Sequence, residues 1–287
     1  MSGFSADWLG LREPADIEAR SARIIARLAR HFRGQRQVSI VDLGCGTGST
    51  LRALAPVLPG QQYWTLIDHD EELLEAAAGV LLQWADVGSR FDNMLQLGKC
   101  GRRLTVRLVA ANLATGLGRE IGPGTRLVTA SALLDLCGAL WIEQLAAAVA
   151  QAGAAFYAPL NFDGVIRWRP DDGLDRAVTA SFCRHQRRDK GLGIAQGAGA
   201  IRQCTRAFAV RGYDVARTPS PWIIADGRLA LELNRGIAGA AAESGMRGSE
   251  FERWCRARYG RASKRPVTTI GHQDVLALPR DVTPPSD

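Results

Sequence analysis

The sequence predicts an α/β protein with a doubly wound, mostly parallel sheet and helices on both faces. Three observations predict this class. Short apolar runs rich in β-branched residues alternate with segments of helical periodicity along residues 37–160. The runs are continuous rather than alternating, as in parallel strands that are covered on both faces. The 287 residues are 46% hydrophobic and 23% charged, which excludes a disordered or fibrous chain.

The elements can be assigned in chain order. An amphipathic helix is expected over residues 13–32, because its apolar residues recur at the spacing of one helix face. The next run, residues 38–48, is a buried strand that ends in a tight glycine turn. We interpret residues 1–36 as an N-terminal helical segment and residues 37–287 as one domain.

Strands and helices then alternate as far as Asn161. Strands are expected at residues 63–67, 104–110, 125–130 and 154–160, and helices at 49–58, 71–87 and 141–152. Residues 163–197 form a polar, charge-rich insertion in which no strand is evident, so we expect a helical insertion after the fifth strand. Helices at 200–211, 228–243 and 249–259, an interrupted strand at 214–224 and a last strand at 267–278 complete the chain.

The segment that decides the functional interpretation is VSIVDLGCGTG, residues 38–48. Its glycines permit positive φ and a close approach of the backbone to a ligand. A dinucleotide-binding loop would read G-x-G-x-x-G, and Ser49 occupies the place of its last glycine. The segment instead resembles motif I of class I S-adenosylmethionine-dependent methyltransferases. The resemblance implies a seven-stranded, Rossmann-like methyltransferase sheet whose last strand, residues 267–278, is antiparallel.

The same resemblance implies the cofactor site. S-adenosylmethionine is the expected cofactor, and its methionine part would lie against Asp42, Gly44, Cys45, Gly46 and Gly48. Asp68 ends the second strand about 20 residues past the loop, where a carboxylate can accept hydrogen bonds from both ribose hydroxyls. A solvated loop acid is the alternative interpretation of Asp68. The other residues expected at the cofactor are His69, Asn112, Leu113 and Ser131. Asn112 stands where the family often has an acid. A weaker resemblance, to a bacterial group of methyltransferases, names no substrate.

The acceptor side is expected at the carboxyl edge of the sheet and in the insertion 163–197. Its candidate substrate contacts are Asp135, Asn161, Trp168, Gln186 and Lys190. The candidate catalytic residues are His185, Asp189 and Asp163. His185 and Asp189 are four residues apart and would share a helix face, so the carboxylate could orient the imidazole as a base. A surface charge cluster is the alternative for this pair, and a helix cap is the alternative for Asp135. His69 and His272 are rival bases.

The predicted function is methyl transfer to a small molecule by in-line displacement, with no metal site. Two alternatives stay open. RNA or protein methylation could use the basic surface, since the net charge is +7 and basic residues cluster between residues 253 and 265 around Trp254 and Tyr259. A non-catalytic S-adenosylmethionine-binding protein is the other. Nucleic acid is not the favoured partner, because the chain lacks the tetrapeptide (D/N)-P-P-(Y/F) and the Pro-Cys nucleophile of base methyltransferases.

The remaining composition bears on location. The six cysteines form no C-x-x-C pair and are expected to be reduced thiols. The N-terminus has no pattern of a secretory signal. The uncharged stretch 144–162 is broken by Gly153 and Pro159, so it does not predict a membrane span. We expect a cytoplasmic protein, and the oligomeric state stays open.

Overall fold

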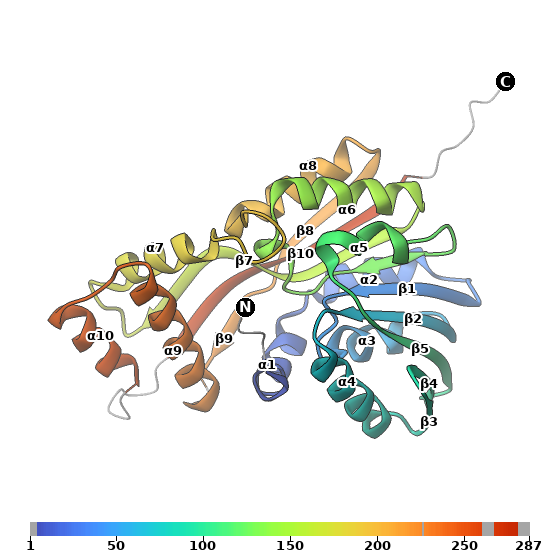
Figure 1. Cartoon of the computed structure of the whole chain (residues 1–287), viewed down its shortest axis with the longest axis horizontal. Helices are drawn as coiled ribbons and strands as arrows, with labels where there is room; N and C mark the ends of the chain where they lie inside the picture. The colour runs from blue at the N-terminus through green and yellow to red at the C-terminus, as the bar shows by residue number, and fades with distance from the viewer. Residues whose placement is uncertain (1–4, 226, 260–266, 281–287) are drawn as a thin grey trace.

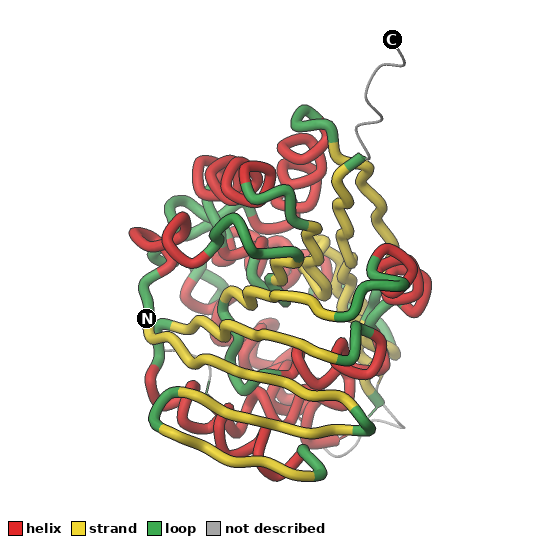
Figure 2. The backbone as a smooth tube through the Cα atoms, turned by 90° about the vertical axis from the view of Figure 1, so that its right-hand side faces the viewer, coloured by secondary structure: helices red, strands yellow, loops and turns green. Residues whose placement is uncertain are grey.

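A computed structural model of the chain describes residues 5–225, 227–259 and 267–280 (Figure 1). One ten-stranded sheet runs through the described residues in the order β3-β4-β5-β2-β1-β6-β7-β10-β8, and β9 pairs with β10. The strands are β1 (Gln37–Leu43), β2 (Gln61–Asp68), β3 (Val87–Phe91), β4 (Met94–Lys99), β5 (Arg102–Ala110), β6 (Leu127–Thr129), β7 (Ala155–Arg169), β8 (Tyr213–Pro219), β9 (Trp222–Ile224) and β10 (Val267–Pro279). Figure 2 shows how strongly the sheet twists from one edge to the other.

The predicted fold class is confirmed. β5, β2, β1, β6 and β7 are parallel neighbours, and β10 lies antiparallel between β7 and β8. The helices are α1 (Ala6–Ala19), α2 (Ala22–His31), α3 (Ser49–Leu54), α4 (Glu71–Trp84), α5 (Leu113–Glu120), α6 (Ala139–Gln151), α7 (Asp175–Gln186), α8 (Ala200–Ala209), α9 (Gly227–Glu243) and α10 (Ser249–Tyr259). Buried side chains of α5, α6 and α8 cover one face of the sheet, and those of α2, α3 and α4 cover the other.

The sheet has ten strands where seven were expected. The additional strands are the β3–β4 hairpin at one edge and the short β9. Every residue of β3 is exposed, including Val87 and Phe91, so the strand has no buried face. Because sequence periodicity reports burial, β3 leaves no signal in the sequence, whereas β4 alternates, with Leu95 and Leu97 buried.

The helix expected over residues 13–32 is two helices, α1 and α2. Arg20 leaves the helical conformation with φ −54° and ψ 131°. The next residue, Ser21, begins α2, and its side chain accepts a hydrogen bond from the Ile24 N–H. A serine in this position is a favourable helix start, so the periodic pattern continues across a real break.

The expected end of the fifth strand at Leu160 is also wrong. β7 continues to Arg169, because β10 pairs with it from Val267 opposite Arg169 to Ala277 opposite Phe156. Residues 163–169 are therefore strand, and the helical part of the insertion is α7. Ile166 and Trp168 are buried while Val165, Arg167 and Arg169 are exposed, so the strand alternates in a segment whose charged residues hide the pattern.

The distal halves of β7 and β10 carry a third hydrophobic cluster beyond the parallel strands. β9, α1, α7, α9 and α10 pack on them, and Trp168, Trp222 and Trp254 lie at the centre of the cluster. In Figure 1 this part occupies the left of the molecule, with α1 between it and the parallel sheet. The carboxyl ends of the parallel strands therefore face elements from later parts of the chain, among them β9, α7, α9 and α10.

Candidate functional site

The glycine loop connects β1 to α3. Gly44, Gly46 and Gly48 have φ values of 64°, 52° and 78°, the left-handed region that favours glycine. The loop also has a close neighbour, since a Cβ atom on Gly46 would lie 2.8 Å from Cδ1 of Leu9 in α1. Both the backbone conformation and the approach of α1 thus require glycine at Gly46.

Asp68 lies beside this loop, at the carboxyl end of β2. Its side chain is 6% exposed. Oδ2 accepts a hydrogen bond of 2.9 Å from the Gly46 N–H, and Oδ1 accepts one of 3.2 Å from the Asp70 N–H. Nδ1 of the exposed His69 lies 3.1 Å from Oδ1. A carboxylate offers about four acceptor positions, so these bonds do not exhaust Asp68.

Two buried charged side chains meet behind the loop, Asp42 and Arg20, with 1% and 6% exposure. Oδ1 of Asp42 accepts a bond of 2.6 Å from the Thr129 hydroxyl, and burial raises the pKa of Asp42 to about 7. Nη2 of Arg20 donates long hydrogen bonds to Thr50 Oγ1 (3.4 Å) and Ser131 Oγ (3.3 Å). Within the described residues, Asp42 Oδ2 and Arg20 Nε and Nη1 have no partner.

Such unmet buried groups cost about 1–3 kcal/mol each, so they point to a ligand that would pair with them. Arg20 was not among the residues expected from the sequence. The one signal that could have indicated it is the break between α1 and α2, which turns the Arg20 side chain inward instead of leaving it on a helix surface. Cys45, also expected here, is buried, and burial raises the pKa of its thiol.

The loop after β5 holds Asn112 and Leu113 next to Asp68. The Ala111 N–H donates to the Asp68 carbonyl at 2.9 Å, which joins the two strand ends. Oδ1 of Asn112 caps α5 by accepting from the Ala114 N–H at 2.9 Å. Leu113 is buried, and its carbonyl accepts from Nε1 of Trp141. The structure thus brings all ten expected cofactor residues to one edge of the sheet.

Asp135 is the buried acid on the acceptor side, 7% exposed in the turn after β6. Burial raises the pKa of Asp135 to about 6, against the lowering effect of the Phe162 N–H and of the charges of Arg12 and Lys190. Two non-glycine residues near this turn have a strained backbone. Ala132, which follows β6, has a φ of 50°, and Leu160, in β7, has a φ of 60°.

His272 is a second buried titratable residue, in β10. Its side chain lies opposite Phe162 in the β10–β7 register, with ring centroids 6.4 Å from Phe162 and 5.0 Å from Trp222. The residue is 8% exposed, and in the described part of the chain its Nδ1 has no partner. Burial and then the charge of Arg12 lower the pKa of His272 to about 3. The imidazole is therefore neutral at physiological pH.

The expected pairing of His185 with Asp189 is wrong. α7 ends at Gln186, so Asp189 does not share a helix face with His185. Asp189 instead accepts a bond of 2.7 Å from the Gly191 N–H within a turn. His185 Nε2 lies 2.9 Å from Glu243 Oε2 at the end of α9. The histidine thus joins α7 to α9.

Three further candidates lie around the acceptor side. Asp163 is half-buried and accepts a bond of 3.0 Å from the Val165 N–H, and its carboxylate fills the space beside Gly271. Burial raises the pKa of Asp163. Gln186 keeps a buried Oε1 that has no partner among the described residues. Lys190 is half-buried and acts electrostatically on Asp135.

Two expected substrate contacts are occupied inside the protein. Trp168 is 3% exposed, and its Nε1 donates to Asn234 Oδ1 at 2.8 Å. Asn161 is fully buried and donates to the carbonyls of Ala158 and Gln273 at 2.8 and 3.3 Å. The structure therefore places both residues in the core, where their polar groups hold the strands.

The basic segment proposed for RNA is largely engaged in internal contacts. Trp254 is fully buried, and Arg258, with 7% side-chain exposure, pairs with Asp175 at 2.6 Å. Arg253 pairs with Asp172 at 2.9 Å. The side chain of Tyr259 and the residues Arg261, Lys264 and Arg265 lie outside the described residues. A buried tryptophan cannot stack on a base, so this segment lacks the expected aromatic contact.

The described residues form neither a cluster of metal-ligating side chains nor a helix that could span a membrane. Across residues 5–225, 227–259 and 267–280, no group of three His, Cys, Asp or Glu side chains is placed to hold a metal ion. None of the described helices is long and apolar enough to cross a membrane.

No protein-family profile matches the chain, and no curated protein matches it. Solved structures do. A structure described as a type II methyltransferase, from Anaeromyxobacter dehalogenans, is 17% identical with a TM-score of 0.47 over 91% of this chain and 98% of its own. A methyltransferase from Thiobacillus denitrificans, in complex with S-adenosyl-L-homocysteine, is 17% identical with a TM-score of 0.45 over 95% and 98%. The YcgJ protein from Bacillus subtilis is 11% identical with a TM-score of 0.47 over 90% and 99%. Because these TM-scores are below 0.5, the fold assignment depends on the strand order of the chain itself.

Proposed function

We propose that the chain is an S-adenosylmethionine-dependent methyltransferase of the class I type. The observation that carries this proposal is the buried pair of Arg20 and Asp42 behind the glycine loop. The cofactor ends in an amino-acid group with one ammonium and one carboxylate. In the described part of the chain, two nitrogens of Arg20, Nε and Nη1, have no partner and could donate to the carboxylate, and Oδ2 of Asp42 has none and could accept from the ammonium. When bound, the cofactor supplies an electrophilic methyl group.

The other parts of the edge suit the rest of the cofactor. The Gly44–Gly48 backbone can approach the methionine chain closely, because it carries no Cβ at three positions. Asp68 is buried at the end of β2 with acceptor capacity left for ribose hydroxyls. Asn112 and Leu113 would lie beside the adenine. The match between the motif, the acid and the parallel strand order supports this assignment.

The acceptor would lie beside Asp135, between the sheet and the third hydrophobic cluster. Methyl transfer needs a nucleophile about 3–3.5 Å from the methyl carbon and in line with the leaving sulfur. Asp135, with a pKa of about 6, is ionised at neutral pH and can accept the proton of the nucleophile. Asp163 and the neutral His272 would flank the acceptor. His185 and Asp189 are not proposed as the base, because their side chains serve other contacts.

We propose a small-molecule acceptor for this site. The polar groups that would meet it, Asp135 and His272, are less than a tenth exposed, and His272 packs against the rings of Phe162 and Trp222. A few convergent polar groups in an apolar surrounding are typical of small-molecule sites. RNA or protein as the acceptor has less support, since Arg253 and Arg258 of the basic segment form ion pairs with Asp172 and Asp175 and Trp254 is buried.

The cofactor assignment can be tested by calorimetry with three ligands. S-adenosylhomocysteine carries the amino-acid group, 5′-methylthioadenosine lacks it, and NAD has neither sulfur nor amino acid. We expect S-adenosylhomocysteine to bind in the micromolar range and NAD not to bind. In Arg20→Met, the affinity for S-adenosylhomocysteine should fall at least about tenfold, because a hydrogen bond to a charged group contributes about 1.5–3 kcal/mol. The affinity for 5′-methylthioadenosine should be unchanged.

The matched control is Arg235→Met, which removes an arginine with 55% side-chain exposure from α9. It should change neither affinity. Preference for NAD over both adenosine ligands would overturn the proposal. Equal weakening of both adenosine ligands by Arg20→Met would show that Arg20 supports the fold of the site and does not bind the amino-acid group.

The acceptor class is tested by label transfer. The protein is incubated with methyl-labelled S-adenosylmethionine and a cell extract, which is then separated into small-molecule, RNA and protein fractions. We expect label in the small-molecule fraction and a strong loss of it with Arg20→Met. Label in the RNA or protein fraction would overturn the small-molecule assignment. Cofactor binding without transfer to any fraction would identify a non-catalytic binding protein.

A further inference from the structure

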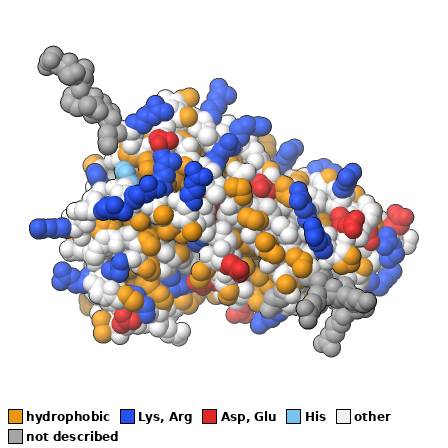
Figure 3. Space-filling view, turned by 180° about the vertical axis from the view of Figure 1, so that it is seen from behind, with side chains coloured by type: hydrophobic (Ala, Val, Ile, Leu, Met, Phe, Trp, Pro, Cys, Tyr) orange, Lys and Arg blue, Asp and Glu red, His pale blue; other side chains and the backbone are white. Residues whose placement is uncertain are grey.

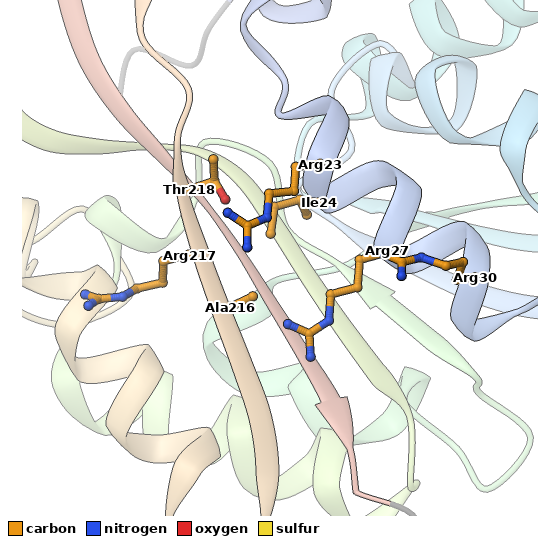
Figure 4. A pocket seen from close by; sticks show the side chains of 7 residues that line it. All are labelled: Arg23, Ile24, Arg27, Arg30, Ala216, Arg217 and Thr218. Atoms are coloured by element: carbon orange, nitrogen blue, oxygen red, sulfur yellow. The ribbon is translucent and has the colours of Figure 1, made fainter.

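A second candidate site lies between α2 and β8, away from the glycine loop. It is a cavity of about 310 Å³ lined by Arg23, Ile24, Arg27 and Arg30 of α2 and by Ala216, Arg217 and Thr218 of β8. Figure 4 shows the guanidinium groups of Arg23 and Arg27 extending from α2 toward β8. The cavity shares no residue with the proposed methyl-transfer site. We name these residues the basic groove.

The charge of the basic groove is largely uncompensated. Asp214 pairs with Arg27, and within the described residues no ion pair engages Arg23, Arg30 or Arg217. Arg217 extends from β8 away from α2, on the opposite side of the strand from Ala216 and Thr218 (Figure 4), so Arg23 and Arg30 leave two uncompensated positive charges at the cavity. Lys and Arg side chains gather on the upper part of the rear face of the molecule (Figure 3), and such a surface attracts anions.

The fold gives no reason for this arrangement. Arg23 is in the first turn of α2, where the helix dipole disfavours a positive charge, and no acid lies in that turn. Arg23 and Arg27 are four residues apart and Arg27 and Arg30 are three apart, so like charges are neighbours on one helix face. Both features destabilise an isolated helix. A multivalent anion in the groove would reverse their effect.

We infer that the basic groove binds a small molecule that carries a phosphate or pyrophosphate group. Guanidinium groups present planar donor pairs that match phosphate oxygens, and the Thr218 hydroxyl adds a neutral donor on the β8 side. Two uncompensated charges suit a divalent anion better than a monocarboxylate. The volume is at the lower end of the roughly 300–1,000 Å³ of ligand sites, which favours pyrophosphate or a mononucleotide.

The test is calorimetric titration of the full chain at low salt with pyrophosphate, AMP, citrate and a single-stranded RNA oligonucleotide. Citrate matches the charge of pyrophosphate but has carboxylates instead of phosphoryl oxygens. We expect pyrophosphate to bind with a submillimolar Kd and more tightly than citrate. The variant Arg23→Gln with Arg30→Gln should weaken pyrophosphate binding at least about tenfold, as loss of charged hydrogen bonds predicts. No cofactor is present, so the result is independent of the proposed methyl transfer.

The matched control is Arg235→Gln with Arg256→Gln, two arginines with 55% and 71% side-chain exposure on α9 and α10. It should bind pyrophosphate as the parent does. Thermal unfolding by circular dichroism checks both variants, and Arg23→Gln alone replaces the double variant if that one is destabilised. Absence of pyrophosphate binding, equal loss in the control, or citrate binding as tightly would each overturn the proposal. RNA binding with a steep salt dependence, in preference to pyrophosphate, would identify a nucleic-acid contact instead.

Discussion

Asp42 illustrates how one residue can be held in an unfavourable state by its surroundings. It lies at the end of a buried strand and is 1% exposed, and burial raises the pKa of its carboxyl to about 7 despite the Thr129 hydroxyl and the charge of Arg20. An acid with a raised pKa binds its proton more tightly in the folded than in the unfolded protein. This group therefore stabilises the fold at low pH, and its contribution is lost as the pH rises.

The sign of this effect gives a pH prediction. The ordinary pKa of an aspartate is 3.8, so the unfolding free energy of the parent relative to Asp42→Asn should fall as the pH rises from about 4 to about 7. The relative value should be flat outside that window. The total change should be a few kcal/mol, since one pKa unit corresponds to about 1.4 kcal/mol. Urea unfolding of both proteins at several pH values measures it. A constant difference across the window would show that Asp42 has an ordinary pKa.

At the scale of elements, the fully buried Asp274 joins three of them. It lies in β10 and accepts hydrogen bonds from the Ser21 N–H at 2.9 Å, the Leu160 N–H at 3.0 Å and the Tyr157 hydroxyl at 3.2 Å. These bonds fix the start of α2 and the strained Leu160 in β7. One carboxylate thereby positions the residues on both sides of the glycine loop.

Asp274→Ala should therefore destabilise the protein strongly. It leaves two buried N–H groups and one buried hydroxyl without an acceptor, and each costs about 1–3 kcal/mol, so a loss of at least about 3 kcal/mol is expected. Tyr157→Phe removes one of the three bonds and should cost about 1 kcal/mol. Denaturant unfolding of the two variants gives both values. Similar small losses in the two would mean that water or a local shift satisfies the groups around Asp274.

The elements also show what sequence could predict. The parallel strands were predictable, because burial on both faces leaves continuous apolar runs. The glycine loop and Asp68 were predictable too, because the loop directly follows β1 and Asp68 is the last residue of β2. The distal half of β7 could not be predicted, because its pairing with β10 joins residues about a hundred positions apart in the chain. Arg20 could not be identified as a site residue from the sequence, and the expected pairing of His185 with Asp189 was wrong, and these two errors have the same cause. Both depend on where a helix ends, which the cap at Ser21 and the end of α7 at Gln186 decide.

At the scale of the whole molecule, α1 links parts that are distant in sequence. Leu9 approaches Gly46 in the glycine loop, and Glu13 forms a 2.6 Å ion pair with Arg52 in α3. Asp16 is buried and accepts from Nε1 of Trp222 in β9. Figure 1 shows α1 between the parallel sheet and the third cluster. A ligand in the glycine loop would therefore contact or displace a helix that also anchors the acceptor side.

This arrangement predicts the response of the molecule to the proposed cofactor. With S-adenosylhomocysteine bound, amide hydrogen exchange should slow in the glycine loop, and also in α1, because Leu9, Glu13 and Arg20 would all be fixed by an occupied site. The β3–β4 hairpin at the far edge of the sheet serves as the internal control, since it contributes no residue to the site and should exchange at the same rate with and without ligand. Mass spectrometry of peptides from residues 6–19, 42–52 and 87–99 measures the three responses in one sample. Slower exchange in the loop together with faster exchange in α1 would mean that the ligand displaces the helix, and α1 would then be an obstacle to binding instead of a wall of the occupied site.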